Sequence, residues 1–120
     1  MTRRDSTEQL ILELYVSDLK ASCEFYTSYG FTLVREEPNF AELKWDDSLL
    51  FLEQVADNPE PPLSPVGNVR IMVDNVDGYW ALSKKLGARV LKPIEDRYYG
   101  LRDFTIAGPD GVGLRFAANL

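Results

Sequence analysis

The chain has 120 residues, of which 45% are apolar and 12% aromatic, a composition that suits one folded domain and excludes wholesale disorder. Its net charge of −6, from 19 acidic and 13 basic residues, disfavours a nucleic-acid partner because phosphate binding requires a basic surface. No apolar run approaches the roughly 20 residues of a membrane helix, and the polar start Met1–Glu8 lacks the pattern of a signal peptide, so we expect a cytoplasmic protein that does not bind membranes.

The first half of the chain predicts a strand, a helix and three further strands. Residues 10–16 are mostly apolar and indicate a strand, after which Ser17 or Asp18 supplies a helix N-cap. The predicted helix covers residues 19–29 and ends at Gly30, a residue typical of helix C-termini. Three strands follow, at residues 31–34, 40–45 and 49–54, with a turn at 46–48.

Residues 57–65 contain four prolines, which prevent a helix or a central strand, so this segment is predicted to link two halves. The second half repeats the first. A strand is predicted at 69–73, a helix at 76–86 capped by Asp74 or Asn75 and ended by Gly87, and strands at 89–91, 103–107 and 112–116.

A shift of 57 residues places Val16 on Val73 and Gly30 on Gly87, which indicates a duplicated unit. We therefore predict an α+β fold in which a single domain, residues 1–120, contains two βαβββ modules. The first repeat covers about 9–55, the linker 57–65, and the second repeat about 67–118.

Histidine is absent, which excludes any mechanism that uses imidazole as a base, relay or metal ligand. Zinc and other transition metals usually recruit histidine or several cysteines, and this chain has one cysteine. Cys23 cannot form an internal disulfide, and its place in the predicted helix indicates an inert, packed thiol.

The segments Leu14–Tyr26 and Tyr29–Phe31 resemble the opening of the vicinal oxygen chelate superfamily. Its members include glyoxalase I, extradiol dioxygenases, fosfomycin-resistance enzymes and bleomycin-resistance proteins. Tyr98–Phe104 and Gly108–Gly111 resemble the closing part of the same proteins. The resemblance implies the glyoxalase/bleomycin-resistance fold, in which paired βαβββ modules form a cupped mixed sheet around a cavity, usually in a homodimer.

Metal-using relatives place ligands at four points, which by resemblance are Ile11, Glu53, Asn68 and Arg115 here. A hydrocarbon side chain has no lone pair to offer, and a guanidinium repels cations. Only Glu53 is a competent ligand, so we assign no metal, no cofactor and no catalytic residue. The closest branch is then the metal-free one that resembles bleomycin-resistance proteins.

Strand alternation places Glu13 and Tyr15, and in the second half Asn68 and Arg70, on the side away from the helices. One hypothesis is that Arg70 and Arg115 pair with Glu13 and Glu53 where relatives hold a metal. The alternative is that these charges reach solvent and pair loosely.

Aromatic rings and one loop complete the candidate site. Rings supply flat surfaces for a planar ligand, although ordinary core or interface packing would explain them as well. The loop that ends in Arg102 and Asp103 resembles a drug-binding loop of bleomycin-resistance proteins. The candidate ligand-binding residues are Glu13, Tyr15, Phe40, Phe51, Glu53, Asn68, Arg70, Tyr98, Tyr99, Arg102, Asp103 and Arg115.

These features favour a metal-free protein that sequesters an aromatic or cationic small molecule, such as an antibiotic, as a homodimer. One alternative is a metal-dependent lyase, isomerase or dioxygenase of the same superfamily. A second alternative is a protein-interaction or regulatory module without a small ligand. The sequence leaves the identity of the ligand open.

Overall fold

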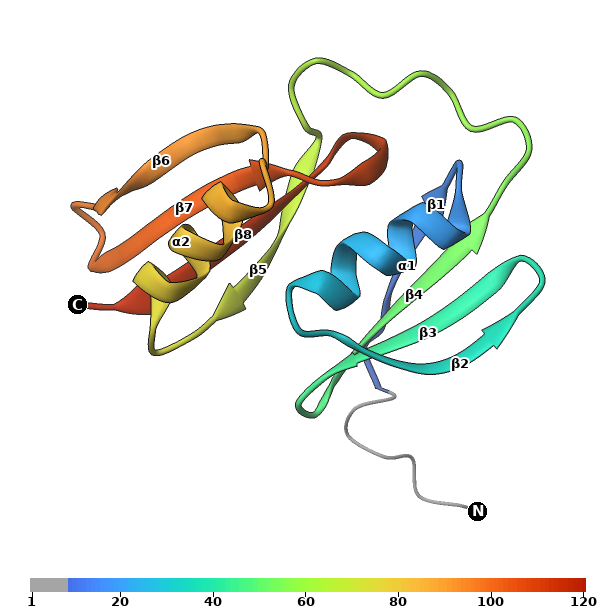
Figure 1. Cartoon of the computed structure of the whole chain (residues 1–120), viewed down its shortest axis with the longest axis horizontal. Coiled ribbons are helices and arrows are strands. Elements are labelled where there is room, and N and C mark those ends of the chain that lie inside the picture. The colour runs from blue at the N-terminus through green and yellow to red at the C-terminus, as the bar shows by residue number, and fades with distance from the viewer. Residues whose placement is uncertain (1–8) are drawn as a thin grey trace. The chain divides into compact units, whose positions relative to one another are not determined.

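The computed structural model describes residues 9–120. Met1–Glu8, on which the prediction of no signal peptide rests, lie outside the described residues. The chain divides into two compact units, residues 1–59 and residues 60–120 (Figure 1). No helix in the described part of the chain has the length and apolar character needed to cross a membrane.

The first unit is a βαβββ module with one four-stranded sheet. Its strands lie in the order β1-β4-β3-β2, with β1 parallel to β4 and the other neighbours antiparallel. The elements are β1 (Leu12–Val16), α1 (Leu19–Ser28), β2 (Thr32–Glu37), β3 (Phe40–Trp45) and β4 (Ser48–Gln54).

The second unit repeats this topology, with strand order β5-β8-β7-β6 and with β5 parallel to β8. Its elements are β5 (Gly67–Met72), α2 (Val76–Lys85), β6 (Val90–Asp96), β7 (Leu101–Ala107), the short 3₁₀ turn η2 (Pro109–Gly111) and β8 (Val112–Asn119). The predicted α+β class and the duplicated βαβββ module are therefore confirmed.

Side-chain caps explain where the two helices begin. The carboxylate of Asp18 accepts a hydrogen bond from the Ala21 amide at 3.1 Å, and the Asn75 side chain accepts one from the Gly78 amide at 3.1 Å. Each bond satisfies an amide that the helix itself leaves without a partner. The helices begin at the predicted residues, Leu19 and Val76.

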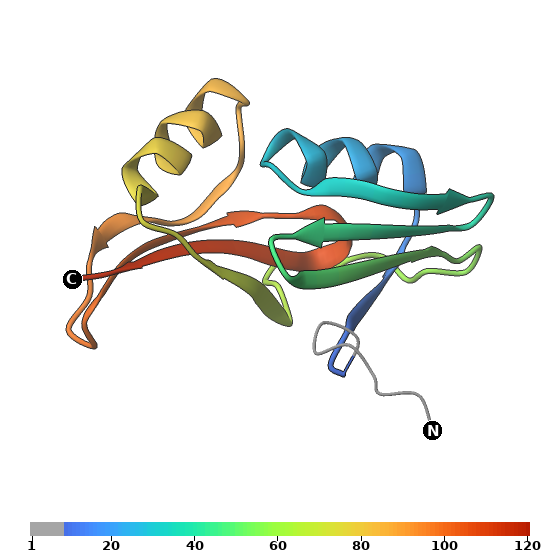
Figure 2. The same ribbon diagram turned by 90° about the horizontal axis from the view of Figure 1, so that it is seen from below.

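Each unit has its own core between its helix and one face of its sheet, and Figure 2 shows each helix on one side of its own strands. In the first unit, α1 buries Tyr26 and Cys23 over Leu43 and Leu52. Burial raises the pKa of the Cys23 thiol, as expected for an inert packed group. In the second unit, Tyr79 of α2 stacks on Phe116 with ring centroids 4.5 Å apart.

The repeat is less regular than a single shift of 57 residues predicts. The helices keep that shift, but Glu13 pairs with Phe51 in the first sheet, whereas Arg70 pairs with Arg115 in the second. Arg115 therefore corresponds to Phe51, 64 residues earlier. The extra residues lie between β6 and β8, mainly in the β6–β7 turn, so Glu53 and Arg115 do not occupy matching positions in the two sheets.

The proline-rich segment packs on the β7–β8 turn of the second unit. Gly111 has a positive φ of 77°, and a Cβ added there would lie 2.8 Å from Cδ of Pro62. The amide of Val66 also donates a hydrogen bond to the Gly111 carbonyl at 3.3 Å. The absence of a side chain at residue 111 therefore lets this segment approach η2.

We expect Gly111→Ala to destabilise the second unit by about 2 kcal/mol, from the left-handed backbone and the clash with Pro62. Gly87→Ala is the matched control, since Gly87 also has a positive φ, of 70°, but open space at the Cβ position. That variant should lose about 1 kcal/mol from backbone strain alone. Equal losses of unfolding free energy in urea would show that Pro62 does not pack on Gly111.

Candidate functional site

The candidate site of the first unit is the face of its sheet that α1 leaves uncovered, which we call the first open face. Residues alternate between the two faces of a strand, so the neighbours of the buried Ala41, Leu43, Leu50 and Leu52 point to this side. The residues on the first open face include Glu13, Tyr15, Thr32, Arg35, Glu37, Phe40, Glu42, Lys44, Leu49, Phe51 and Glu53.

Two half-buried rings lie next to each other on this face. Phe40 of β3 and Phe51 of β4 meet edge to face, with their centroids 5.1 Å apart. The guanidinium of Arg35 lies 4.9 Å from the centre of the Phe40 ring and 3.5 Å from a carboxylate oxygen of Glu42. Tyr15, 60% exposed, comes from β1. The result is an apolar ring surface bordered by carboxylates, which suits a planar ligand with positive charge.

One transverse row of residues shows the charge of this face. Pairing register places Glu13 beside Phe51, Phe51 beside Glu42, and Glu42 beside Arg35, across all four strands. The row therefore carries two carboxylates, one ring and one guanidinium. In the unit as a whole, residues 1–59 contain twelve acidic and five basic residues.

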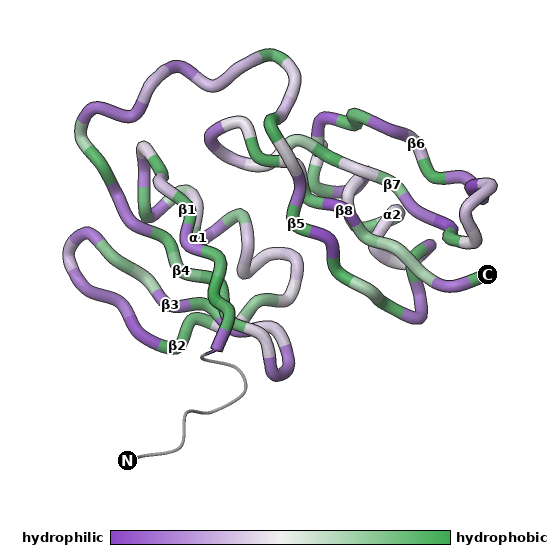
Figure 3. Tube along the Cα trace, turned by 180° about the vertical axis from the view of Figure 1, so that it is seen from behind, coloured by the Kyte–Doolittle hydropathy of each residue, from purple (hydrophilic) through white to green (hydrophobic). Residues whose placement is uncertain are grey.

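The second open face, the corresponding side of the second sheet, has the opposite charge. The equivalent row runs from Arg70 through Arg115 and Thr105 to Lys92, so it carries three cations and a hydroxyl. Along β5, Figure 3 shows hydrophilic residues alternating with hydrophobic ones, as expected for a strand with one buried side. Residues 60–120 contain eight basic and seven acidic residues.

A buried carboxylate organises part of the second open face. Asp103 of β7 is only 1% exposed. It accepts hydrogen bonds from Nε of Arg97 at 2.8 Å, from the Tyr99 hydroxyl at 2.8 Å, and from Arg115 through Nε at 3.1 Å and through Nη2. The Tyr99 hydroxyl also accepts a bond from Nη2 of Arg115 at 2.7 Å. We call these four residues the Asp103 cluster.

Contacts within the cluster shift the pKa values of Asp103 and Tyr99 away from neutral pH. Burial alone would raise the pKa of Asp103, but hydrogen bonds from Arg115, Arg97 and Tyr99 outweigh it and hold that pKa below its ordinary value. The bond to the Asp103 carboxylate raises the pKa of Tyr99. The Asp103 carboxylate is therefore ionised, and Tyr99 neutral, throughout the physiological range.

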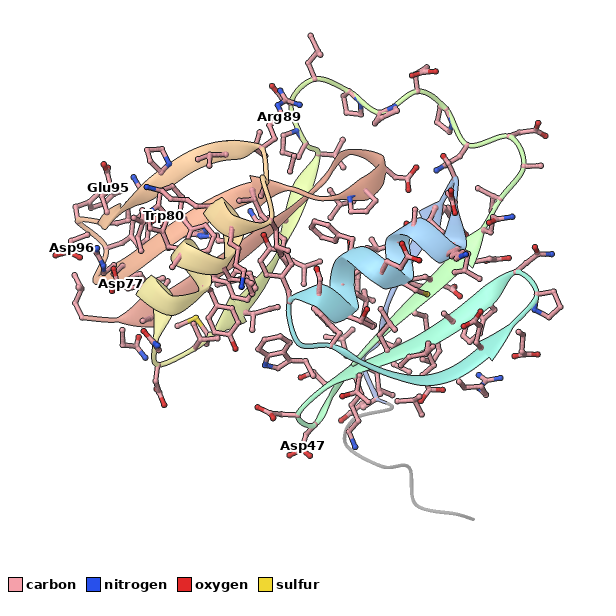
Figure 4. All side chains as sticks on the ribbon, in the orientation of Figure 1. Asp47, Asp77, Trp80, Arg89, Glu95 and Asp96 are labelled. Carbon is pink, nitrogen blue, oxygen red and sulfur yellow. The ribbon has the colours of Figure 1, made fainter. Side chains whose placement is uncertain are left out.

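A pocket of about 450 Å³ lies at the end of the second open face next to the proline-rich segment. The sheet contributes Asn68, Lys92, Thr105 and Arg115, and the preceding segment contributes Leu63 and Pro65. Arg89, at the start of the β6 edge, also lines it, and Figure 4 shows this side chain beside the chain segment that leads to β5. None of the lining residues is acidic.

Two of the residues proposed from the sequence, Arg102 and Tyr98, do not lie on the second open face. Arg102 lies on the helix side of β7, where it binds Asp77 of α2 at 2.9 Å and Asp96 at 3.1 Å, carboxylates that Figure 4 shows at one end of the unit. The side chain of Tyr98 is fully exposed at the β6–β7 turn. The structure does bring Tyr99, Asp103 and Arg115 together. The hypothesis that Arg70 and Arg115 pair with Glu13 and Glu53 concerns residues of two different units, and it stays a prediction.

The residues present do not fit a catalytic metal of the kind that some relatives use. Pairing register shows that the counterpart of Glu53 in the second sheet is Ala117, whose side chain has no donor atom. Ile11 offers no donor either, which leaves one carboxylate and one amide, Asn68. Within residues 9–120, no three His, Cys, Asp or Glu side chains lie close enough together to hold an ion. A donor set of this kind does not make a transition-metal site.

Sequence reasoning missed five residues that shape the open faces: Arg35, Glu42, Lys92, Arg97 and Thr105. Arg35 and Glu42 would have followed from aligning β2 with β3 as a hairpin. Arg97 reaches Asp103 because Gly100 closes a tight turn, in which its amide binds the Arg97 carbonyl at 3.1 Å. The Tyr98-Tyr99-Gly100 segment was the available signal for that turn.

Comparisons with known proteins agree with this architecture. Residues 9–116 match the model of the Glyoxalase/Bleomycin resistance protein/Dioxygenase superfamily. Bleomycin resistance proteins of Geobacillus stearothermophilus and Staphylococcus aureus are each 31% identical over 126 residues, covering 90% of this chain and 94% of theirs.

Solved structures show the same fold. A glyoxalase/bleomycin resistance protein/dioxygenase from Nocardioides has a TM-score of 0.78 and 25% identity, with 100% of this chain and 87% of that chain covered. A bleomycin-binding protein complexed with bleomycin has a TM-score of 0.75 and 21% identity, with 95% of this chain and 100% of that chain covered. Fold, module duplication and sequence agree, and the chain belongs to the Glyoxalase/Bleomycin resistance protein/Dioxygenase superfamily.

Proposed function

We propose that this protein binds and sequesters an aromatic or cationic small molecule, such as an antibiotic, without a metal and without changing it chemically. The observation that carries the proposal is the half-buried Phe40–Phe51 pair of the first open face, which lies among the carboxylates of Glu13, Glu42 and Glu53. Rings bind a planar group by stacking, and carboxylates attract its positive charge.

Two further observations support this function. The bleomycin resistance proteins that match 90% of the chain are named for resistance to an antibiotic. The donor set offers no transition-metal site, so the metal-dependent chemistry of other superfamily members has no evident support in these residues. The proposed assembly is a homodimer, in keeping with the exposed apolar side chains Leu12 and Met72 on the edge strands β1 and β5.

Equilibrium dialysis of the full chain against bleomycin tests the proposal, with mass spectrometry of the recovered ligand and light scattering of the same sample. With bleomycin raised stepwise to about 1 mM, we expect retention that saturates for any Kd tighter than about 0.1 mM, and recovery of unaltered bleomycin. Dialysis is preferable to tryptophan fluorescence, because Trp45 and Trp80 contact core rings, Phe31 and Phe104. No retention, or a ligand of changed mass, would contradict sequestration of this drug.

A further inference from the structure

The second open face carries positive charge that its own unit does not neutralise. Among the basic residues of this unit, Arg97 and Arg102 each bind two carboxylates, and Arg115 shares Asp103 with Arg97. Arg70, Arg89 and Lys92 differ, since none of them forms an ion pair with any carboxylate of residues 60–120, all of which the structure describes.

These cations converge on one region. Arg70 and Arg115 are direct neighbours on β5 and β8, and Lys92 lies in the same row. Like charges placed side by side on a sheet repel each other, so an anion bound between them would lower the energy of the face. The nearest acid of this face, Asp103, is buried and already bound by two arginines.

The pocket beside this row has the donors that an anion needs. Lys92, Arg89 and Arg115 supply charge, whereas the Asn68 amide and the Thr105 hydroxyl can donate further hydrogen bonds. Nε and Nη2 of Arg115 are directed at Asp103, and its Nη1 has no hydrogen-bond partner among residues 60–120. A guanidinium held by a buried carboxylate is pre-oriented for a charge-assisted bond with its remaining nitrogen.

We propose that this pocket, the anion pocket (Asn68, Arg89, Lys92, Thr105 and Arg115), binds the carboxylate of an organic acid. The organic part packs against the apolar wall formed by Leu63, Pro65 and Leu91. That the pocket binds a carboxylate is argued from the second unit alone. That this carboxylate is part of the sequestered ligand rests on the proposed function.

Titration of the full chain with benzoate, followed by amide chemical shifts in NMR, tests the anion pocket. We expect benzoate to move the amide signals of Lys92, Thr105 and Arg115 at low salt. Benzamide, the neutral analogue, should leave them in place, and acetate should bind at least about five-fold more weakly because it lacks a ring to cover the apolar wall. Raising the salt concentration about ten-fold should weaken benzoate binding, since the pocket is open to solvent.

The decisive variant is Lys92→Gln, which removes one exposed charge from the edge strand and leaves the core intact. It should weaken benzoate about five- to ten-fold, as expected for one charge in a partly exposed site. Lys85→Gln on α2 is the matched control and should change the affinity less than about two-fold, because it lies outside the anion pocket. The inference is overturned if benzamide binds like benzoate, if acetate binds as tightly as benzoate, or if the two lysine variants behave alike.

The result is separable from the proposed function. Benzoate reports on residues 60–120, and bleomycin is expected to bind through the rings of the first open face. Benzoate binding without bleomycin binding would keep the anion pocket and reject that drug as the ligand. Bleomycin binding with no benzoate response would reject the anion pocket and keep bleomycin as a ligand of the protein.

Discussion

Asp103→Asn is expected to destabilise the second unit by about 3 kcal/mol, as is typical when one partner of a buried ion-pair network is removed. The Asp103 side chain is 2% exposed, and those of Arg97 and Arg115 are 16% and 14% exposed. Removing the carboxylate charge would leave two mostly buried guanidinium groups facing a neutral amide. Urea unfolding gives the free energy, and an unchanged denaturant slope would show that the unfolded state is comparable.

Asp96→Asn is the matched control, because Asp96 also binds an arginine, Arg102, but its side chain is 61% exposed. Exposed ion pairs contribute about 0–1 kcal/mol, so this variant should stay close to the parent. A loss below about 1 kcal/mol for Asp103→Asn would mean that water already compensates the two arginines, and the Asp103 cluster would then not organise the second open face.

The same cluster predicts how stability depends on pH. Because the pKa of Asp103 is lower in the folded chain than in the unfolded chain, where it is about 3.9, its ionised form stabilises the fold. This contribution is fully present above about pH 4 and is lost as the pH falls from there through the folded-state pKa. When the pH is lowered from neutral to about 3, the free energy of unfolding should therefore fall less for Asp103→Asn than for the parent chain.

Replacing both rings of the first open face, as Phe40→Leu with Phe51→Leu, is expected to weaken bleomycin binding about 30-fold. Leucine keeps most of the apolar volume of these half-buried sites, so the fold should persist, but it removes the flat surface on which a planar ligand stacks. A loss of about 2 kcal/mol is typical when central aromatic contacts are removed. Equilibrium dialysis against the parent chain gives the ratio.

Phe25→Leu serves as the aromatic control for this variant. Phe25 is also half-buried, but it lies on α1, where it contacts Tyr26 and Tyr29. The Phe25→Leu variant should keep its affinity for bleomycin within about two-fold of the parent, since α1 covers the other side of the sheet. If the double variant retained its affinity, or if Phe25→Leu lost as much, the ligand would be held somewhere other than the first open face.

Local signals in the sequence were sufficient for the modules and their helices. Asp18 and Asn75 cap the helices because short polar side chains satisfy the first amides, and this preference is visible without any tertiary information. The alternation of β1 and β5 likewise placed Glu13 and Arg70 on the open faces. These are properties of neighbouring residues, which a single sequence contains.

The pairing of distant strands could not be obtained in the same way. The β6–β7 turn lengthens the second module, and β6 contains Pro93, which an edge strand tolerates because it needs no ladder hydrogen bond on its outer side. The predicted strand at residues 89–91 therefore stopped short of Asp96. Without the pairing register, Arg115 could not be aligned with Phe51. The difference in charge between the two transverse rows could therefore not be predicted from the sequence.

The most direct test of the central claim is a map of amide chemical-shift changes as the parent chain is titrated with bleomycin. If the first open face holds the ligand, the largest changes should fall on β3 and β4, around Phe40, Glu42 and Phe51, with smaller changes on α1. Changes concentrated on the helices, or an absence of change at concentrations where dialysis shows retention, would contradict binding at this face.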